Sequence, residues 1–369
     1  MLLTIAAVMT LIEPEGARAF SIPSSDGVAI RGQADRPDLA GTGAVVMVAG
    51  TGPFDRDVDF GAPGEEPALV FLDLSRRLNA RGVATVRYDK RGVRHGEAGD
   101  AGIDRAEIVT ATTGAMREDL AAVYDWTRSP EGLGARCVVL FGHSEGMVHI
   151  GRLAASGAPA SAVVVGMGTI LTDPARNFRW NLTERDSWSL RMMDADEDGI
   201  TTNEEVRAGL ATTPAAVNGV VEPYLAPDGG WTADDTAELD RQWQAAWPIF
   251  RDQALAMDDA APWPTADQAA GSWQWWKSWY SDETAVAANL ARWDGPVIAH
   301  LGDRDSQTHA PLQREAGERF LGSRVTFVLH SGVGHTLGDH PTYGPVRPDL
   351  ADGMADQIAA ALRSCAAGG

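Results

Sequence analysis

The sequence has few cysteines, no excess of positive charge and no long apolar run, and each absence excludes a class of protein. Its two cysteines, Cys137 and Cys365, are too few for a disulfide framework and lie in no Cys/His cluster that could bind zinc, so we expect free structural thiols. A formal net charge of −20 repels phosphate groups and argues against a nucleic-acid partner. No stretch reaches the roughly 18 to 20 apolar residues of a membrane-spanning helix, so we expect no membrane span.

Short apolar, β-branched segments alternate with amphipathic ones along most of the 369 residues. The predicted strands are 28–31, 44–48, 83–88, 137–141, 162–165, 297–301 and 325–329. The predicted helices are 67–80, 116–127, 145–155, 311–320 and 350–362. Strands and helices that alternate in this way imply right-handed crossovers. We therefore predict an α/β fold with a mostly parallel, doubly wound sheet that helices cover on both faces.

The alternation stops in the middle of the chain. We predict a core formed by residues 20–170 and 295–369, with a mainly helical cap, residues 171–294, inserted into it. The cap holds eleven of the twelve tryptophans, most of which should fill its own core. The segment 271–280 has too many aromatic residues for one buried helix face. Some of them should line a substrate cavity over the active site.

Residues 1–19 have two interpretations that the sequence leaves open. Met1 to Ile12 is an apolar run of signal-peptide length, and Ala17-Arg18-Ala19 is similar to a small-residue cleavage site, although the charged n-region of a signal peptide is missing. The alternative is an extra N-terminal strand.

A candidate nucleophile lies between a predicted strand and a predicted helix. Gly142-His143-Ser144-Glu145-Gly146 fits G-x-S-x-G, follows the strand 137–141 and precedes the helix 145–155. A sharp turn of this kind exposes the serine hydroxyl and directs the next amide at a developing oxyanion. We predict Ser144 as nucleophile and the Glu145 amide as one oxyanion donor. The alternative is a structural turn serine.

Serine becomes a nucleophile only when a base takes its proton, and the other two members should follow in the order Asp or Glu, then His. Asp305 follows the strand 297–301, and His335 lies in the glycine-rich loop after the strand 325–329. We predict His335 as base and Asp305 as its orienting carboxylate. The alternatives are Asp303, Asp173, His330 and His340. The other histidines of interest, expected to be hydrogen-bonded packing residues, are His143, His149 and His300.

The loop Ala49-Gly50-Thr51-Gly52-Pro53 follows the strand 44–48. Its glycines let the backbone approach a substrate carbonyl, so we predict the Thr51 amide as the second oxyanion donor. The alternative is a plain turn.

Three ordered motifs resemble the α/β-hydrolases, specifically a branch of esterases and serine aminopeptidase-like enzymes. They are the GTGPFDRD segment 50–57, the RYDKRG turn 87–92 and the GHSEG elbow 142–146. The resemblance covers roughly residues 17–170 and 295–365, and Ala49 departs from it because this branch often has histidine there. It implies a serine hydrolase that needs no cofactor for catalysis. The charged residues of the first two motifs, expected to form loop-fixing ion pairs, are Asp55, Arg56, Asp89 and Arg91.

The cap contains an acidic twelve-residue loop, 194–205, with carboxylates at positions 1, 3, 5 and 12 and glycine at position 6. It resembles an EF-hand loop and predicts a structural Ca²⁺ site. The predicted ligands are Asp194, Asp196, Asp198, the Ile200 carbonyl, Thr202 and Glu205. Position 8 is Thr201, and we expect no second loop to pair with it. The alternative is an acidic solvated turn; a working calcium site would favour an exported or periplasmic location over a cytoplasmic one.

The sequence thus predicts a serine hydrolase that cleaves small carboxylic esters through an acyl-enzyme. An amide or short-peptide hydrolase of the aminopeptidase type could use the same triad, and the Glu145 side chain could either receive a substrate amine or face away. A third hypothesis, from another class, is a non-catalytic calcium- or ligand-binding protein on a hydrolase scaffold.

Overall fold

The computed structural model describes residues 16–62, 65–97, 99–157, 162–263 and 271–368. Its main sheet has eight strands in the order β1-β2-β4-β3-β5-β6-β11-β12. The pairs β1-β2 and β2-β4 are antiparallel, and the other pairs are parallel. The strands are β1 Arg18–Pro23, β2 Ala29–Asp35, β3 Ala44–Val48, β4 Ala84–Tyr88, β5 Val138–His143, β6 Val163–Met167, β11 Val297–Gly302 and β12 Val325–His330. The predicted, mostly parallel α/β sheet is confirmed.

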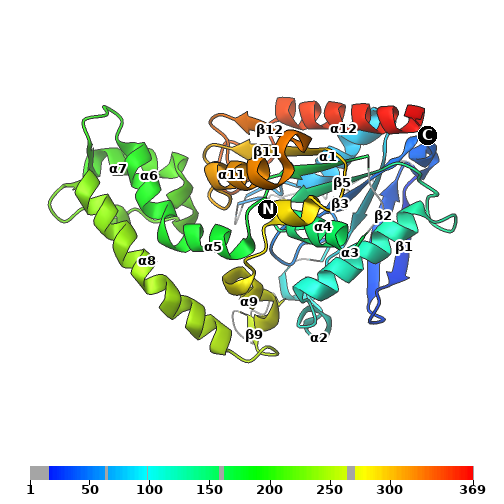
Figure 1. Cartoon of the computed structure of the whole chain (residues 1–369), viewed down its shortest axis with the longest axis horizontal. Coiled ribbons are helices and arrows are strands. Elements are labelled where there is room, and N and C mark those ends of the chain that lie inside the picture. Colours follow the sequence, from blue (N-terminus) through cyan, green and yellow to red (C-terminus); the bar gives the residue numbers. More distant parts are fainter. Residues whose placement is uncertain (1–15, 63–64, 98, 158–161, 264–270, 369) are drawn as a thin grey trace, which may run out of the picture.

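Helices cover both faces of this sheet (Figure 1). Those on one face are α1 Val70–Ala80 and α12 Pro348–Gly368, and those on the other are α3 Thr113–Arg128, α4 Gly146–Ala155, α10 Val286–Leu290 and α11 Ala310–Leu321. The shorter helical elements outside the cap are α2 Arg105–Ile108, η1 Pro37–Thr42, η2 Gly99–Gly102 and η6 Gly322–Arg324.

Strand β3 shows why the central strands are apolar throughout. Val45 and Met47 belong to the core cluster under α1 and α12, while Val46 and Val48 belong to the cluster under α3 and α4. Successive side chains of a strand point to opposite faces, so a strand buried on both faces needs apolar residues at every position.

The expectation of two free thiols is wrong. Cys137, just before β5, and Cys365, in α12, form a disulfide with a Cα–Cα distance of 6.1 Å. The bond attaches the C-terminal helix to the centre of the sheet. Spacing along the chain could not indicate the pair, because 228 residues separate the two cysteines and only the fold brings them together.

The inserted segment folds into helices that extend away from the sheet, with α8 along their outer side (Figure 1). The helices of this cap are α5 Pro174–Thr183, α6 Arg185–Met193, α7 Asn203–Gly209, η3 Leu210–Thr212, η4 Pro214–Asn218, η5 Glu222–Tyr224, α8 Ala233–Ala256 and α9 Trp273–Ser281. Its short strands are β7 Ile200–Thr202, β8 Gly230–Thr232, β9 Pro262–Trp263 and β10 Gly271–Ser272. A separate small core, which includes Leu190, Val206 and Tyr224, lies among α6, α7 and η5.

Two of the predicted boundaries, the end of the N-terminal segment and the end of the cap, can be compared with the observed elements. Residues 1–15 of the expected signal segment lie outside the described residues, whereas Arg18 and Ala19 are already part of β1 and pair with β2. Near the other boundary, α10 packs on α4, and its Val286 and Leu290 join the main core. Among the described residues, no helix is long and apolar enough to cross a membrane.

Candidate active site

Ser144 lies in the turn between β5 and α4, with φ of 52°. This left-handed backbone is strained for serine, and strain of this kind is typical of functional turns. Tight packing explains the flanking glycine: a Cβ on Gly146 would lie 2.2 Å from the carbonyl oxygen of Val48. Strand β5, the turn at Ser144 and helix α4 therefore follow one another in the predicted order, with Ser144 itself buried.

Asp305 and His335 lie together at the ends of neighbouring strands. Asp305 follows β11, His335 follows β12, and these two strands pair in parallel. His335 Nδ1 is 2.9 Å from each carboxylate oxygen of Asp305. Both side chains are buried. With Nδ1 engaged by Asp305, Nε2 of His335 is the nitrogen that could accept a proton.

The alternative acids and bases have other partners. Asp303 accepts hydrogen bonds from the Ser331 hydroxyl and the Gly332 amide, and Asp173 caps the N-terminus of α5. Nε2 of His330 is 3.0 Å from Nδ1 of His300. His340 accepts from two backbone amides, those of Thr342 and Tyr343.

The loop after β3 approaches the serine turn closely. A Cβ on Gly50 would lie 2.8 Å from His143 Nδ1 and 3.1 Å from the Ser144 Cβ, so only glycine fits here. In the part of the chain that the structure describes, the amides of Thr51 and Glu145 donate no hydrogen bond to another protein group. Both predicted oxyanion donors are therefore free to bind a ligand oxygen.

Ser144 and His335 line one cavity of about 400 Å³ between the sheet and the cap. Its walls are mainly aromatic and apolar, with Phe54, Phe60, Ile170, Phe178, Trp276 and Trp279 among the lining residues. The polar lining residues include Thr51, Asn177, Asn181 and Gln307. A cavity of this size and composition suits a small, largely apolar molecule with one polar group at the serine.

The tryptophan-rich helix α9 has two roles. Trp275 and Trp279 are buried, while Trp276 and Trp279 line the cavity. Trp273 instead lines a second hollow within the cap. The expectation that some of these residues face a cavity is thus met.

The side chain of Glu145 faces away from the cavity. Its Oε1 accepts a hydrogen bond from Trp275 Nε1 at 2.5 Å, and its Oε2 accepts one from Lys90 Nζ at 3.1 Å. Burial alone would raise the pKa of Glu145, but Lys90 and the hydrogen bond from Trp275 hold the pKa below its usual value. An ionised carboxylate engaged in this way is not positioned to receive a substrate amine.

Lys90 is the residue of this region that sequence reasoning missed. Besides Glu145, it donates to the Gly50 carbonyl oxygen at 2.7 Å, and its Nζ lies 4.6 Å from the centre of the Trp275 ring. The signal was available, since only Lys90 and Lys277 of the 31 basic residues are lysines.

Two of the histidines expected to be hydrogen-bonded are not. The ring nitrogens of His143 and His149 are buried, and among the described residues neither ring has a hydrogen-bond partner. Burial, with a smaller effect of His335, holds the pKa of His143 well below its usual range, and burial lowers the pKa of His149 to about 3. Both rings are therefore neutral, and His143 also lines the cavity. His300 does bond, to His330 and Gln357.

Charged residues of the first two motifs fix the loops around the site. Arg56 forms a bidentate pair with Asp89 at 3.0 and 2.6 Å, and Arg91 pairs with Asp119. Both pairs are buried. Asp55 differs from expectation, because its carboxylate accepts the amides of Asp57 and Gly96 and forms no ion pair among the described residues.

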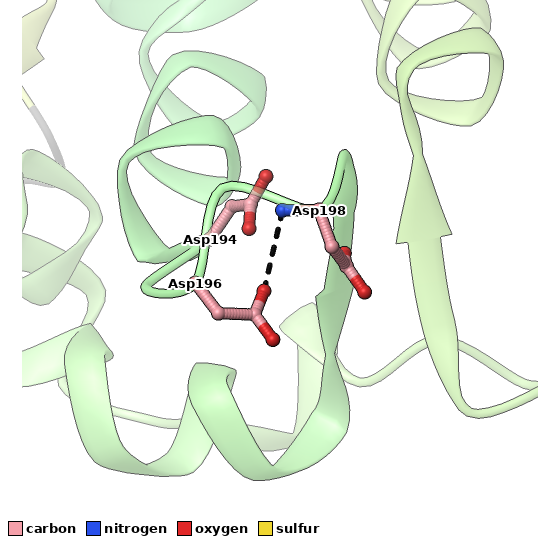
Figure 2. A group of neighbouring side chains, drawn as sticks. All are labelled: Asp194, Asp196 and Asp198. Atoms are coloured by element: carbon pink, nitrogen blue, oxygen red, sulfur yellow. Dashed lines mark hydrogen bonds between the residues drawn. The ribbon is translucent and has the colours of Figure 1, made fainter.

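The acidic loop brings three carboxylates together, those of Asp194, Asp196 and Asp198, with one oxygen of each within 4.8 Å of the others (Figure 2). Glu205 does not join them, because it accepts the amides of Ala195 and Thr202 and the Thr202 hydroxyl in a capping box. One buried oxygen, Asp194 Oδ1, has no hydrogen-bond partner among the described residues.

The expectation that no second loop pairs with this one is wrong. β7 pairs with β8 in antiparallel register, with Thr201 opposite Trp231, and each strand leads into a helix through a capping box. Counting back from Trp231, the positions equivalent to Asp194 and Asp196 are Tyr224 and Ala226. Because these residues have no carboxylate, a search for the calcium pattern misses the second loop.

Known proteins resemble this chain in fold but not in sequence. No family model matches the sequence, and no curated protein matches it. A thermostable carboxyl esterase from Bacillus coagulans aligns over 94% of this chain and 99% of its own, with 14% identity and a TM-score of 0.53. The proline iminopeptidase from Mycobacterium smegmatis aligns over 95% and 100%, with 14% identity and a TM-score of 0.52. Together with the strand order and the serine turn, these likenesses show that the chain has the α/β-hydrolase fold.

Proposed function

We propose that the protein is a serine hydrolase that cleaves carboxylic esters with apolar acyl groups. The observation that supports this most strongly is that Ser144 and His335 line one aromatic cavity while Asp305 holds the other nitrogen of His335. An unrelated turn serine would have no reason to face a cavity beside a buried His–Asp pair.

In this mechanism, Ser144 Oγ attacks the ester carbonyl while His335 Nε2 takes its proton. The Asp305 carboxylate accepts a hydrogen bond from the Nδ1–H of His335 and stabilises the imidazolium that forms. The amides of Thr51 and Glu145 donate to the tetrahedral oxyanion. The imidazolium then protonates the departing alcohol, and water, activated by the same histidine, hydrolyses the acyl-enzyme. No cofactor takes part.

The cavity supports the choice of ester over amide. Its aromatic wall suits an acyl chain, and each methylene buried there contributes ~0.8 kcal/mol until the space is full. An acidic side chain facing the cavity would favour an amine substrate, but that of Glu145 is buried against Lys90 and Trp275. Amide hydrolysis nevertheless uses the same triad, so it remains the second candidate.

Two measurements test the proposal. A fluorophosphonate probe should label the wild type and not Ser144→Ala, whereas a non-catalytic binding protein would leave both unlabelled. Turnover of p-nitrophenyl esters of increasing chain length should then be compared with that of aminoacyl-nitroanilides. Faster nitroanilide turnover would favour the amide hydrolase, and equal kcat/KM from acetyl to octanoyl esters would contradict an acyl-binding cavity.

We also propose that the acidic loop holds a structural Ca²⁺. Asp194, Asp196 and Asp198 supply converging carboxylates, and the unpartnered Asp194 Oδ1 is an oxygen that a cation would satisfy. The Ile200 carbonyl, Thr202 and Glu205 would complete the ligand set, which requires Glu205 to leave part of its capping box. A bound ion would remove the repulsion among these carboxylates and stabilise the cap.

Calorimetry and thermal melting with calcium and with EGTA test this site. At free calcium of a hundred times Kd, a native-state site adds ~2.7 kcal/mol to the free energy of unfolding. The double variant Asp194→Ala/Glu205→Ala should lose that gain. An equal response in both proteins, or none in the wild type, would mean that the loop is an acidic turn.

We further propose that the protein is exported. The Cys137–Cys365 disulfide supports this, because disulfides form and persist in oxidising compartments. Expression of the full chain in a Gram-negative host, with cell fractionation and thiol titration, tests it. A protein recovered in the cytoplasm would contradict export.

A further inference from the structure

A buried lysine touches both halves of the proposed oxyanion hole. Lys90 Nζ donates to the Gly50 carbonyl oxygen at 2.7 Å and to Glu145 Oε2 at 3.1 Å. Gly50 immediately precedes Thr51, and Glu145 immediately follows Ser144. One ammonium group therefore joins the loop after β3 to the serine turn before α4.

The hydrogen bond from Lys90 to the Gly50 carbonyl acts on the peptide group that also contains the Thr51 N–H. The Gly50 carbonyl and the Thr51 N–H belong to the same planar, conjugated group. A cation hydrogen-bonded to the carbonyl draws electron density towards oxygen, which makes the N–H at the other end a stronger donor. Hydrogen bonds that polarise one another in this way strengthen in a low-dielectric interior, and Lys90 is largely buried, with a side-chain exposure of 9%.

The choice of lysine is itself informative. Of the 31 basic residues, 29 are arginines, and the buried cations of the neighbouring pairs, Arg56, Arg87 and Arg91, are all arginine. A bidentate guanidinium suits those carboxylates, whereas a compact ammonium can point separate protons at a carbonyl and a carboxylate. At residue 90 a single ammonium group reaches both acceptors, the Gly50 carbonyl oxygen and Glu145 Oε2.

Helix α9 of the cap also contacts the Lys90–Glu145 ion pair. Trp275 of α9 donates its indole N–H to Glu145 Oε1, and its ring lies against the Lys90 ammonium. Trp275 is 1% exposed, so these contacts are shielded from water and competing ions. The indole completes the surroundings of an ion pair that would otherwise be costly to bury.

We propose that Lys90 is a positioning residue of the oxyanion hole: it polarises the Gly50–Thr51 peptide and, through Glu145, holds the loop that carries the Thr51 amide against the turn that carries the Glu145 amide. This inference rests on the proposed serine-hydrolase function. Lys90 does not touch the substrate; it acts through the two amides. Its effect falls on the transition state, where the oxyanion carries full charge, and little on substrate binding.

The test compares Lys90→Met with Lys277→Met, the matched removal of the other lysine, which lies on α9 two residues from Trp275 and bonds Asp259 and the Met257 carbonyl. Loss of a whole oxyanion donor costs roughly 10²- to 10³-fold in kcat. Weakening one donor should therefore lower kcat by about 10- to 100-fold in Lys90→Met, with KM within about threefold of the wild type. Lys277→Met should match the wild type in both constants.

A spectroscopic measurement separates polarisation from a general loss of structure. The infrared stretch of an isotope-labelled acyl carbonyl in a slowly deacylating acyl-enzyme reports the strength of the oxyanion hydrogen bonds. It should shift to higher frequency in Lys90→Met and not in Lys277→Met. Lys90→Gln keeps a donor of similar length, so it retains the packing without the charge. It should fall between wild type and Lys90→Met in both readouts, and it serves as the test if Lys90→Met does not fold.

Each outcome is decisive. A folded Lys90→Met or Lys90→Gln with wild-type kcat and an unshifted carbonyl band would overturn the role of Lys90. An increase in KM alone would also overturn it, because that result indicates substrate binding. Wild-type turnover that persists in Ser144→Ala would instead refute the serine-hydrolase function, so the two failures are distinguishable.

Discussion

Replacing Asp305 by asparagine tests the base and its orientation together. Asp305 Oδ1 accepts the amides of Gln307 at 2.7 Å and Thr308 at 2.8 Å, while Oδ2 accepts the Thr308 hydroxyl at 2.5 Å. The asparagine oxygen must take the Oδ1 position, because two backbone donors point there. Its NH₂ group then takes the Oδ2 position, where the Thr308 hydroxyl can rotate to accept from it. His335 Nδ1 would face this NH₂ group and an oxygen that already has two donors.

The imidazole of the variant should therefore carry its proton on Nε2, the nitrogen that must accept the proton of Ser144. The variant also loses the negative charge that stabilises the imidazolium. Together these effects lower kcat by up to ~10⁴ in a triad, which corresponds to about 5.4 kcal/mol at 1.36 kcal/mol per tenfold. Water cannot substitute for the lost carboxylate, because Asp305 is only 2% exposed.

The assay is kcat for a p-nitrophenyl ester, with thermal melting to confirm the fold, and the matched control is Asp303→Asn. Among the described residues the Asp303 side chain bonds only Ser331 and Gly332, so its variant should stay within about threefold of the wild type, as surface polar changes outside special features usually do. If Asp303→Asn is crippling and Asp305→Asn is mild, the assignment of the orienting aspartate is wrong.

Three further predictions concern stability and specificity. Cys137→Ser/Cys365→Ser should lower the free energy of unfolding by up to about 5 kcal/mol, the chain entropy of a 228-residue loop; equal urea midpoints would contradict this. Trp276→Ala should remove part of the acyl wall and reduce the octanoyl-to-acetyl ratio of kcat/KM by about tenfold, as expected for fewer buried methylenes; an unchanged ratio would place the acyl chain elsewhere. The hydrogen bond with Asp57, partly offset by burial, raises the pKa of His95 above its ordinary 6.5, so its stabilisation is present below pH 6.5 and lost as pH rises through the raised pKa. The difference in unfolding free energy between wild type and His95→Gln should therefore shrink from acid to alkaline pH, and a constant difference would contradict the argument.

The parts of the fold that the sequence predicts are those governed by local pattern. β3 was predicted with its observed bounds, Ala44–Val48, because a strand buried on both faces needs an unbroken apolar run. The serine turn was predicted because glycine is required where the backbone is crowded, as at Gly146. The same logic located β11 and β12, whose ends bring Asp305 and His335 together.

The parts that were missed depend on contacts between distant segments. The disulfide joins residues 228 positions apart, and neither cysteine has a local sequence signature. The second loop of the cap was missed for two reasons. Its strand β8 pairs with β7 through backbone hydrogen bonds, which leave no signature in the sequence. In addition, Tyr224 and Ala226 lack the carboxylates of the calcium pattern. The rarity of lysine marks Lys90 in the sequence, but its two acceptors lie 40 and 55 residues away, so the sequence does not indicate which groups it binds.

The contacts of Glu145 explain why an acidic residue can follow the nucleophile without opposing the chemistry. A bare carboxylate beside the serine would repel a developing oxyanion. Here it faces away, Lys90 pairs with it, and the Trp275 indole N–H donates a hydrogen bond to it. The positive end of the ion pair donates to the Gly50 carbonyl, which belongs to the peptide that carries one predicted oxyanion donor. The negative charge of Glu145 thus lowers the cost of burying the Lys90 cation next to that peptide.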